Sequence, residues 1–360
     1  MTVPVEADSA IELYSAAGDA FAGRRLGFGR RRAAVAARFA RHRGAAEGEI
    51  AASWVAGALA EIGLLDVVVP PDASPRVRLL AMADAPLHGA RIVAASFGTA
   101  GHAADLVRWH REHDDGTGFP DRLRWDGIPA DAAALGIVNA FLEAAEDPEE
   151  ARGPAEALFA ILAESGRRFR VELVRTFREF VAGAPDWDEP IVLDLPVVDR
   201  DAALEALAAR IDARDPRIEG RSARLAALAA SVAGRLGLDG VRAARLALLL
   251  ALGRAAETVD HDDFDPLSRF ARERRTGVAS RAAAIAASVP GYASDAPLVA
   301  ASARWFEDGQ VDRLAGTLAL VLAADGLEPV EGARRIGAAA GTQFDPEVTR
   351  AYLAGLGAAT

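Results

Sequence analysis

The chain has 360 residues, a formal net charge of −11 and an isoelectric point near 5.2. It contains no cysteine, and its 41 basic residues are all arginine. These facts exclude disulfides, thiolate catalysis, zinc fingers, Schiff-base chemistry and the lysine of a P-loop.

The sequence of the first residues, the hydropathy pattern and the net charge indicate where the protein is located and which partners it lacks. Residues 1–19 are acidic and lack the basic-then-apolar pattern of a secretion signal. No charge-free apolar run reaches the roughly 18 residues that a membrane span needs. We therefore predict a cytoplasmic protein without a membrane span. Arg30–Arg32 form a basic cluster, but the acidic net charge and the lack of a recognisable DNA-contacting helix argue against a nucleic-acid partner.

Amphipathic helices are predicted along most of the chain. Apolar residues recur at spacings of three and four, as in the helical run 132–145 and in two stripes: Leu158, Ile161 and Leu162, then Leu225, Leu228, Val232 and Leu236. Glycine and proline interrupt the pattern at short intervals, which is typical of a helical domain with short loops. The exception is 190–198, a β-branched run bounded by prolines, which predicts an extended linker or a single strand.

The two halves of the chain contain matching segments in the same order. Residues 57–63 (GALAEIG) match 247–253 (ALLLALG), 110–116 (HREHDDG) match 303–309 (ARWFEDG), and 166–173 (GRRFRVEL) match 341–348 (GTQFDPEV). Three matches in one order favour a duplication. We therefore predict an all-α protein with two helical domains in tandem, at 1–185 and 216–360, joined by a linker at 186–215 with a short extended segment.

One segment is more specific than these helices. Residues 110–120 (HREHDDGTGFP) resemble the HHExxDGxGYP signature of HD-GYP domains, a branch of the HD metal-dependent phosphohydrolases. Residues 214–225 resemble the family's opening DPxTxGHSxRV, and 340–347 its closing AGTQFDPE. The resemblance covers most of 25–180 and 214–355. It implies HD-like helical domains around two or three divalent metal ions such as Fe or Mn, whose bound water hydrolyses cyclic di-GMP or a related cyclic dinucleotide.

The family's ligand positions are largely replaced in the first half. The resemblance places its metal-ligand positions at Arg31 (or Arg30), Ala60, Glu61, Ala85, His110, Arg111 and Asn139. A weak remnant metal set of Glu61, His110 and Asn139 is left. In the second half the corresponding positions carry Arg221, Leu250, Ala251, Val278, Ala303, Arg304 and Leu322. We expect no metal in the second half and no bound cofactor overall.

Two features keep two interpretations open. The arginines at or beside former ligand positions, Arg31, Arg111, Arg221, Arg254 and Arg304, suit an anion pocket, with Arg31 and Arg111 as candidates, or ion pairs with carboxylates such as Glu61. The polar cluster around His110 and Glu112 suits a rebuilt metal or phosphate site, or a loop shaped by Asp115, Gly116 and Gly118.

Two functional hypotheses follow. The first is a non-catalytic protein, derived from a cyclic di-GMP phosphodiesterase, that acts in signalling or as a scaffold through a cyclic dinucleotide or a protein partner. The second is a metal-dependent phosphodiesterase with an altered site in the first domain, in which His110 and Glu112 are the catalytic candidates beside Glu61 and Asn139. A homodimer is compatible with either hypothesis.

Overall fold

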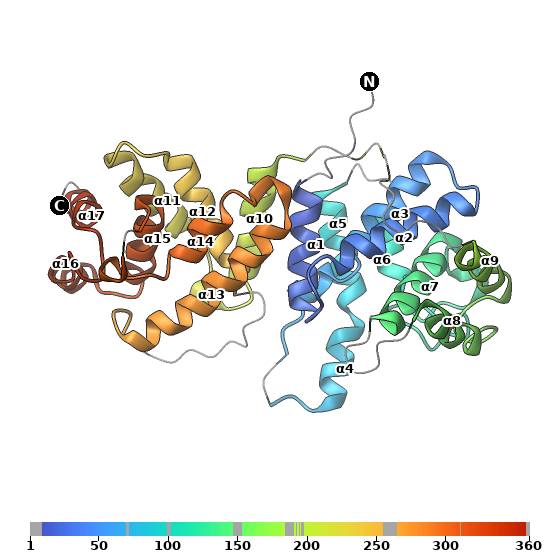
Figure 1. The fold of residues 1–360 in the computed structure, drawn as a ribbon. Coiled ribbons are helices and arrows are strands. Elements are labelled where there is room, and N and C mark those ends of the chain that lie inside the picture. The colour runs from blue at the N-terminus through green and yellow to red at the C-terminus, as the bar shows by residue number, and fades with distance from the viewer. Residues whose placement is uncertain are drawn as a thin grey trace, which may run out of the picture. The chain divides into compact units, whose positions relative to one another are not determined.

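The computed structural model describes residues 9–69, 72–98, 102–146, 153–183, 191, 193, 195, 198–254, 265–309 and 311–357. The chain divides into two compact units, Met1–Val198 and Asp199–Thr360. Within the described ranges the regular structure is helical, and the β contacts are two isolated bridges, Ser165 with Phe169 and Ala340 with Phe344 (Figure 1). The prediction of an all-α fold is confirmed.

The first unit is built from helices that share one apolar core. Its α-helices are α1 (Ser9–Phe21), α2 (Phe28–His42), α3 (Glu47–Leu59), α4 (Pro75–Ala83), α5 (Ala85–Ser96), α6 (Ala103–Trp109), α7 (Ala130–Ala145), α8 (Pro154–Ala163) and α9 (Val171–Ala182), with short 3-10 helices η1 (Ile62–Asp66) and η2 (Trp125–Gly127). Rings of Phe39, Phe141, Phe177 and Phe180 pack against one another where α2, α7 and α9 meet.

The second unit repeats this type of construction. It consists of α10 (Arg200–Asp212), η3 (Pro216–Ile218), α11 (Arg221–Arg235), α12 (Gly240–Leu252), α13 (Arg269–Ser288), η4 (Pro290–Tyr292), α14 (Ala296–Ala301), η5 (Phe306–Asp308), α15 (Arg313–Ala324), α16 (Pro329–Ala338) and α17 (Pro346–Gly357). The apolar run 246–252 lies in α12 and is buried throughout. A helical run that is apolar and buried on every side marks the centre of a core.

The prediction of a linker over 186–215 is wrong for residues 200–212, which form α10. Asp199 caps this helix by accepting hydrogen bonds from the backbone N–H groups of residues 201 and 202. Leu204, Leu207 and Ile211 recur at helical spacing and are buried in the second unit, so the segment belongs to that unit's core. Most of the predicted extended segment 190–198 lies outside the described residues.

Two kinds of local contact occur in both units: an aspartate that caps the following helix, and a glycine that lies close to a backbone carbonyl. Asp19 at the end of α1 accepts hydrogen bonds from the backbone N–H groups of Gly27 and Gly29 at the start of α2. Asp212 at the end of α10 accepts one from Ser222 at the start of α11. A Cβ at Gly63 would lie 1.8 Å from the carbonyl oxygen of Ala85, and one at Gly253 would lie 2.0 Å from that of Val278. In both units a helix therefore approaches so closely that only glycine fits.

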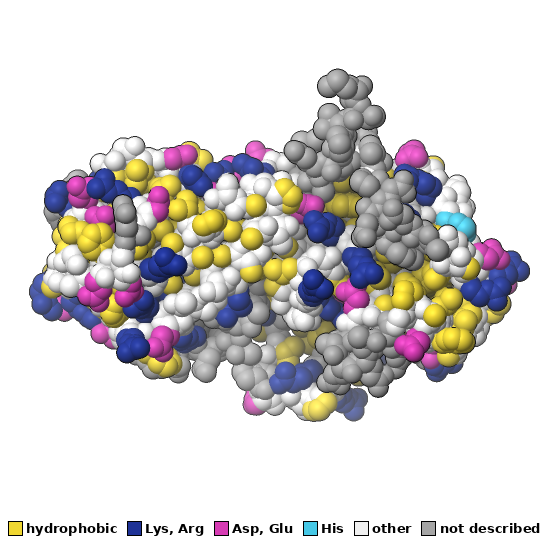
Figure 2. Space-filling view, in the orientation of Figure 1, with side chains coloured by type: hydrophobic (Ala, Val, Ile, Leu, Met, Phe, Trp, Pro, Cys, Tyr) yellow, Lys and Arg dark blue, Asp and Glu magenta, His cyan; other side chains and the backbone are white. Residues whose placement is uncertain are grey.

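Charge on the surface is mixed. Figure 2 shows basic and acidic side chains interspersed over both units on the face in view. Among the described helices, none is long and apolar enough to cross a lipid bilayer.

Candidate functional site

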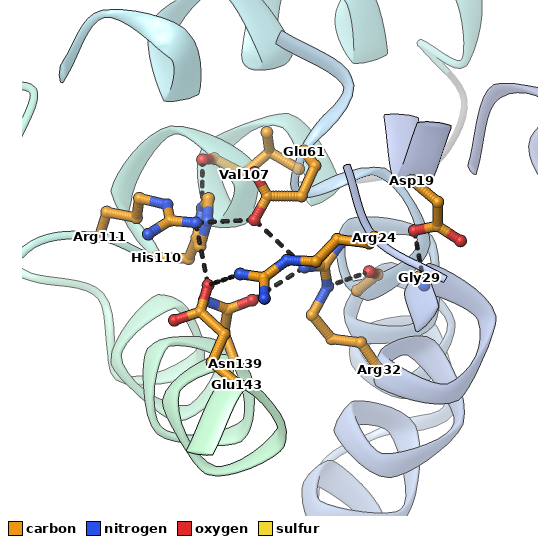
Figure 3. A network of polar contacts seen from close by, with 11 residues as sticks. Asp19, Arg24, Gly29, Arg32, Glu61, Val107, His110, Arg111, Asn139 and Glu143 are labelled. Carbon is orange, nitrogen blue, oxygen red and sulfur yellow. Dashed lines mark hydrogen bonds and ion pairs between the residues drawn. The ribbon is translucent and has the colours of Figure 1, made fainter. Parts of the chain in front are cut away.

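Four segments of the first unit bring polar side chains to one buried place. Glu61 follows α3, His110 ends α6, Asn139 lies in α7, and Arg32 projects from α2. Arg32 is fully buried, and the other three residues are at most 7% exposed. The structure thus unites the three residues predicted as a remnant metal set, and it adds Arg32 among them (Figure 3).

Arg32 occupies the middle of this polar network. Its Nη1 donates to Asn139 Oδ1 at 2.8 Å and lies 3.4 Å from Glu61 Oε1. Its Nε donates to the carbonyl oxygen of Gly57 at 2.7 Å, and its guanidinium lies over the ring of Phe28. A permanent cation is therefore held between the carboxylate and the amide.

Arg111 supplies a second guanidinium to Glu61. Its Nη2 donates to Glu61 Oε1 at 2.7 Å and to Glu143 Oε1 at 3.3 Å. Glu143 in turn accepts from Arg24 at 2.8 Å. Burial opposes the ionisation of Glu61, but the charges of Arg111 and Arg32 outweigh it and lower its pKa to about 2. Glu61 is accordingly a carboxylate at neutral pH, and the same contact raises the pKa of Arg111.

His110 keeps the orientation of a metal-binding histidine. Its Nδ1 lies 2.7 Å from the carbonyl oxygen of Val107. Burial and the charge of Arg111 lower the pKa of His110 to about 3, so the ring is neutral and Nδ1 carries the proton that it donates. Its Nε2 then presents a lone pair, and this atom is buried without a hydrogen-bond partner among the described residues. A backbone carbonyl on Nδ1 is the usual outer contact of a ligating imidazole.

The donor set does not fit the two-metal centre that the family resemblance implies. The carboxylate of Glu61 is shared by two guanidinium groups, and the amide oxygen of Asn139 accepts from Arg32. Of these three side chains, His110 alone has an acceptor atom, Nε2, that is buried without a hydrogen-bond partner among the described residues. A divalent ion here would lie beside two fixed positive charges that cannot deprotonate. Within the part of the chain that the structure describes, no group of three or more His, Asp or Glu side chains is arranged around a common point for a metal.

Glu112 supports a loop. Its Oε1 accepts from the backbone N–H of Asp121 at 2.6 Å, and its Oε2 accepts from that of Leu123 at 2.9 Å. Burial raises the pKa of Glu112. In the same loop a Cβ at Gly118 would lie 2.3 Å from the backbone nitrogen of His113. These contacts match the interpretation of the segment as a loop shaped by its own turn residues.

The two candidates for an anion pocket in this unit lie in different surroundings. Arg31 is 53% exposed and pairs with Glu146, just after α7. Arg111 is held by Glu61 and Glu143. The contacts of both arginines are ion pairs with carboxylates.

Similar caps lie at the start of α2 and of α11. The backbone N–H of Gly29 and that of Ser222 each donate to an aspartate near the end of the preceding helix.

In the second unit, side chains from the corresponding helices line a cavity of about 160 Å³. Arginines and apolar residues share its lining: Arg221, Arg254, Arg274 and Arg275 with Leu225, Ala247, Leu250, Ala251, Val278 and Leu322. Arg304 is exposed and is not part of this lining.

Arg32 and Glu143 are among the residues of these sites that the sequence analysis did not identify as site residues. Arg32 belongs to the basic cluster Arg30–Arg32, which the sequence analysis considered only as a possible contact to nucleic acid. Its spacing from Phe28, Val35 and Phe39 places it on the buried face of α2. Glu143 lies four residues after Asn139 in α7, on the same helix face. Helical spacing was the signal available for both.

Comparison with known proteins gives one informative result. No family model matches the chain, and no curated protein matches it. A solved structure does: the crystal structure described as that of a cyclic GMP-AMP specific phosphodiesterase in V. cholerae (V-cGAP3) aligns with a TM-score of 0.67. The alignment covers 97% of each chain at 16% sequence identity. At this identity the likeness concerns the fold alone, so the chain shares the helical fold of that solved structure.

Proposed function

We propose that this chain is a non-catalytic relative of the cyclic dinucleotide phosphodiesterases and that it acts in signalling or assembly by binding. The observation that carries the proposal is the guanidinium of Arg32 between Glu61 and Asn139. Hydrolysis by this fold needs cations that polarise the phosphate and activate water. A guanidinium supplies charge but cannot bind water as a Lewis acid does.

The ion pairs make this arrangement hard to displace. Glu61 and Arg32 are both almost completely removed from solvent. Breaking a buried ion pair costs about 3–5 kcal/mol because the remaining charge has no partner. A metal ion entering between Glu61 and Asn139 would have to repay this cost and also overcome its repulsion from Arg111.

The second unit supports the same proposal. We propose that the two units arose by duplication, because their helices follow in the same order and share the capping aspartates and the close-contact glycines. At positions that the family resemblance assigns to metal ligands, the second unit carries aliphatic side chains such as Leu250 and Leu322. These side chains have no atoms that bind a cation.

The partners that fit the proposal are a cyclic dinucleotide bound without turnover, a protein, or a second copy of the chain. V-cGAP3, with which the chain shares its fold, is described as acting on cyclic GMP-AMP, which makes a cyclic dinucleotide the first ligand to test.

The deciding experiment is elemental analysis of protein expressed in medium supplemented with iron and manganese and purified without chelators. We expect much less than one ion per chain. The same preparation, incubated with cyclic dinucleotides and added Mn²⁺, is expected to release no linear product. Two tightly bound ions per chain would contradict the proposal.

The alternative, a phosphodiesterase with an altered site, is favoured by one observation: the lone pair on the buried Nε2 of His110. It predicts Mn²⁺-dependent hydrolysis that is lost in His110→Ala and retained in His88→Ala. Absence of turnover over a panel of divalent metals would dismiss it.

A further inference from the structure

The arginine-lined cavity of the second unit lies among four helices. Its lining comes from α11, α12, α13 and α15, whose places in the fold are seen in Figure 1, and from Arg254 in the turn after α12. At about 160 Å³ it far exceeds the roughly 10–15 Å³ that one water molecule requires. The cavity therefore has room for a compact ligand.

Positive charge is concentrated at this cavity. Arg221 pairs with Asp325 at 2.6 Å, and Arg254 pairs with Asp212 at 2.6 Å. Arg275 donates its Nη1 to a neutral acceptor, the carbonyl oxygen of Pro266, at 2.7 Å. Burial and the charges of Arg221 and Arg272 lower the pKa of Arg275 to about 10, so it stays protonated at neutral pH. Among the described residues, the charged groups that act most on Arg275 are thus cations.

An anion in the cavity would relieve this repulsion. A guanidinium presents several N–H donors in a planar fork that matches two oxygens of a phosphate group. The rest of the lining is apolar, with Leu225, Leu250 and Val278 among its members. A pocket that combines cations with an apolar wall suits a molecule with a phosphate at one end and an apolar or planar group at the other.

We propose that the cavity lined by Arg221, Arg254, Arg274 and Arg275 binds a small organic phosphate, with the phosphate on the arginines and its apolar or planar part against Leu225, Leu250 and Val278. The site belongs to the second unit alone, and it goes beyond the proposed function because it holds whether or not the first unit hydrolyses anything.

Titration calorimetry with AMP, adenosine and inorganic phosphate tests this proposal on the full chain at low ionic strength. We expect AMP to bind at one site per chain, more tightly than inorganic phosphate, and adenosine not to bind measurably. Added salt is expected to weaken AMP binding, because it screens charges that remain partly open to solvent.

Two substitutions in α13 provide the matched comparison. Arg275→Gln removes a lining cation and is expected to weaken AMP binding about tenfold or more, as the loss of a charge-assisted contact does. Arg269→Gln alters the first residue of the same helix, which is 84% exposed and pairs with Glu273, and is expected to leave the affinity unchanged. Arg275→Lys keeps the charge without the fork and is expected to fall between them. Thermal melting without ligand confirms that each variant is folded.

Several results would overturn the proposal. Equal weakening by Arg275→Gln and Arg269→Gln would place the anion elsewhere. Equal affinity for AMP and adenosine would remove the role of the arginines, and equal affinity for AMP and phosphate would remove that of the apolar wall. Failure of both AMP and phosphate to bind at millimolar concentration would refute it outright. Loss of AMP binding leaves the metal analysis of the first unit unaffected, so the two proposals fail separately.

Discussion

The polar centre of the first unit and the cavity of the second unit differ in how their arginines are compensated. In the first unit, Arg32 and Arg111 converge on Glu61, and Glu143 joins Arg111 to Arg24. In the second unit, Arg275 donates to a neutral carbonyl, and its strongest charged neighbours among the described residues are cations. Buried charge is stable when it is paired within the protein, whereas unbalanced charge beside a cavity favours a ligand of opposite sign. The first arrangement favours stability, and the second fits the proposed binding of an anion.

The largest expected effect comes from breaking the network of the first unit. Arg32→Met keeps the approximate length of the side chain but leaves Glu61 and Asn139 buried without this partner. We expect a loss of about 3–5 kcal/mol in the free energy of unfolding, measured by urea denaturation. Arg31→Met, at a neighbouring exposed position, is expected to change it by less than about 0.5 kcal/mol. Equal effects of the two substitutions would show that the network adds no stability.

The next largest effect is expected at Gly63 and Gly253, each of which lies close to a backbone carbonyl of a neighbouring helix. Gly63→Ala and Gly253→Ala each place a methyl group against a backbone carbonyl. We expect each to lower the free energy of unfolding by about 1–3 kcal/mol or more, since backbone must move to make room. Gly48→Ala in α3 meets no atom within 4 Å and is expected to stabilise the protein by about 0.4–1 kcal/mol. A large loss at only one of the two sites would weaken the correspondence between the units.

The pH dependence of stability tests the buried histidine. The pKa of His110 falls from its ordinary value of 6.5 to about 3 on folding. Between these values the unfolded chain binds the extra proton, so stability falls as the pH drops below 6.5. In His110→Gln, we expect the slope of unfolding free energy against pH between pH 6 and pH 5 to decrease by up to about 1.4 kcal/mol per pH unit. An unchanged slope would mean that the pKa of His110 is the same in the folded and the unfolded protein.

Glu61 affects the pH dependence of stability at lower pH than His110 does. Its pKa is lowered from 4.5 to about 2, so its contribution is complete above pH 4.5 and is lost as the pH falls toward 2. This loss is expected to persist in His110→Gln and to disappear in Glu61→Gln, which separates the two groups by the pH at which each acts.

The smallest expected effect sharpens the contrast with the second unit. Arg275→Gln removes a cation from a cationic neighbourhood, so the loss of its contact with Pro266 is offset by reduced repulsion. We expect the free energy of unfolding without ligand to change by less than about 1 kcal/mol. A loss as large as that of Arg32→Met would show that this arginine is a structural part of the core.

Parts of this fold and site follow from the sequence. Helical spacing predicted a helix over 132–145, and the structure places α7 at Ala130–Ala145. The resemblance singled out Glu61, His110 and Asn139, and the structure brings them together. The linker prediction failed at α10 because proline and charge around 186–215 hid the apolar spacing of Leu204, Leu207 and Ile211.

The partners of these residues were harder to predict. Which of Arg30, Arg31 and Arg32 enters the core depends on the rotation of α2, and the cap from Asp19 to Gly27 and Gly29 sets where that helix begins. Arg274 and Arg275 lie in α13, outside the recognised motifs, and they reach the cavity through packing between helices distant in sequence. Such contacts follow from tertiary arrangement, which local spacing does not encode.

The buried position of Arg32 also has an evolutionary consequence. A single substitution that introduced a metal-binding side chain beside Arg32 would leave the neighbouring charges unbalanced, and the protein would lose stability. Under the proposed function, a gain of hydrolysis would therefore require coordinated substitutions at Arg32, Arg111 and Asn139. The buried guanidinium thus opposes a stepwise change toward a metal centre.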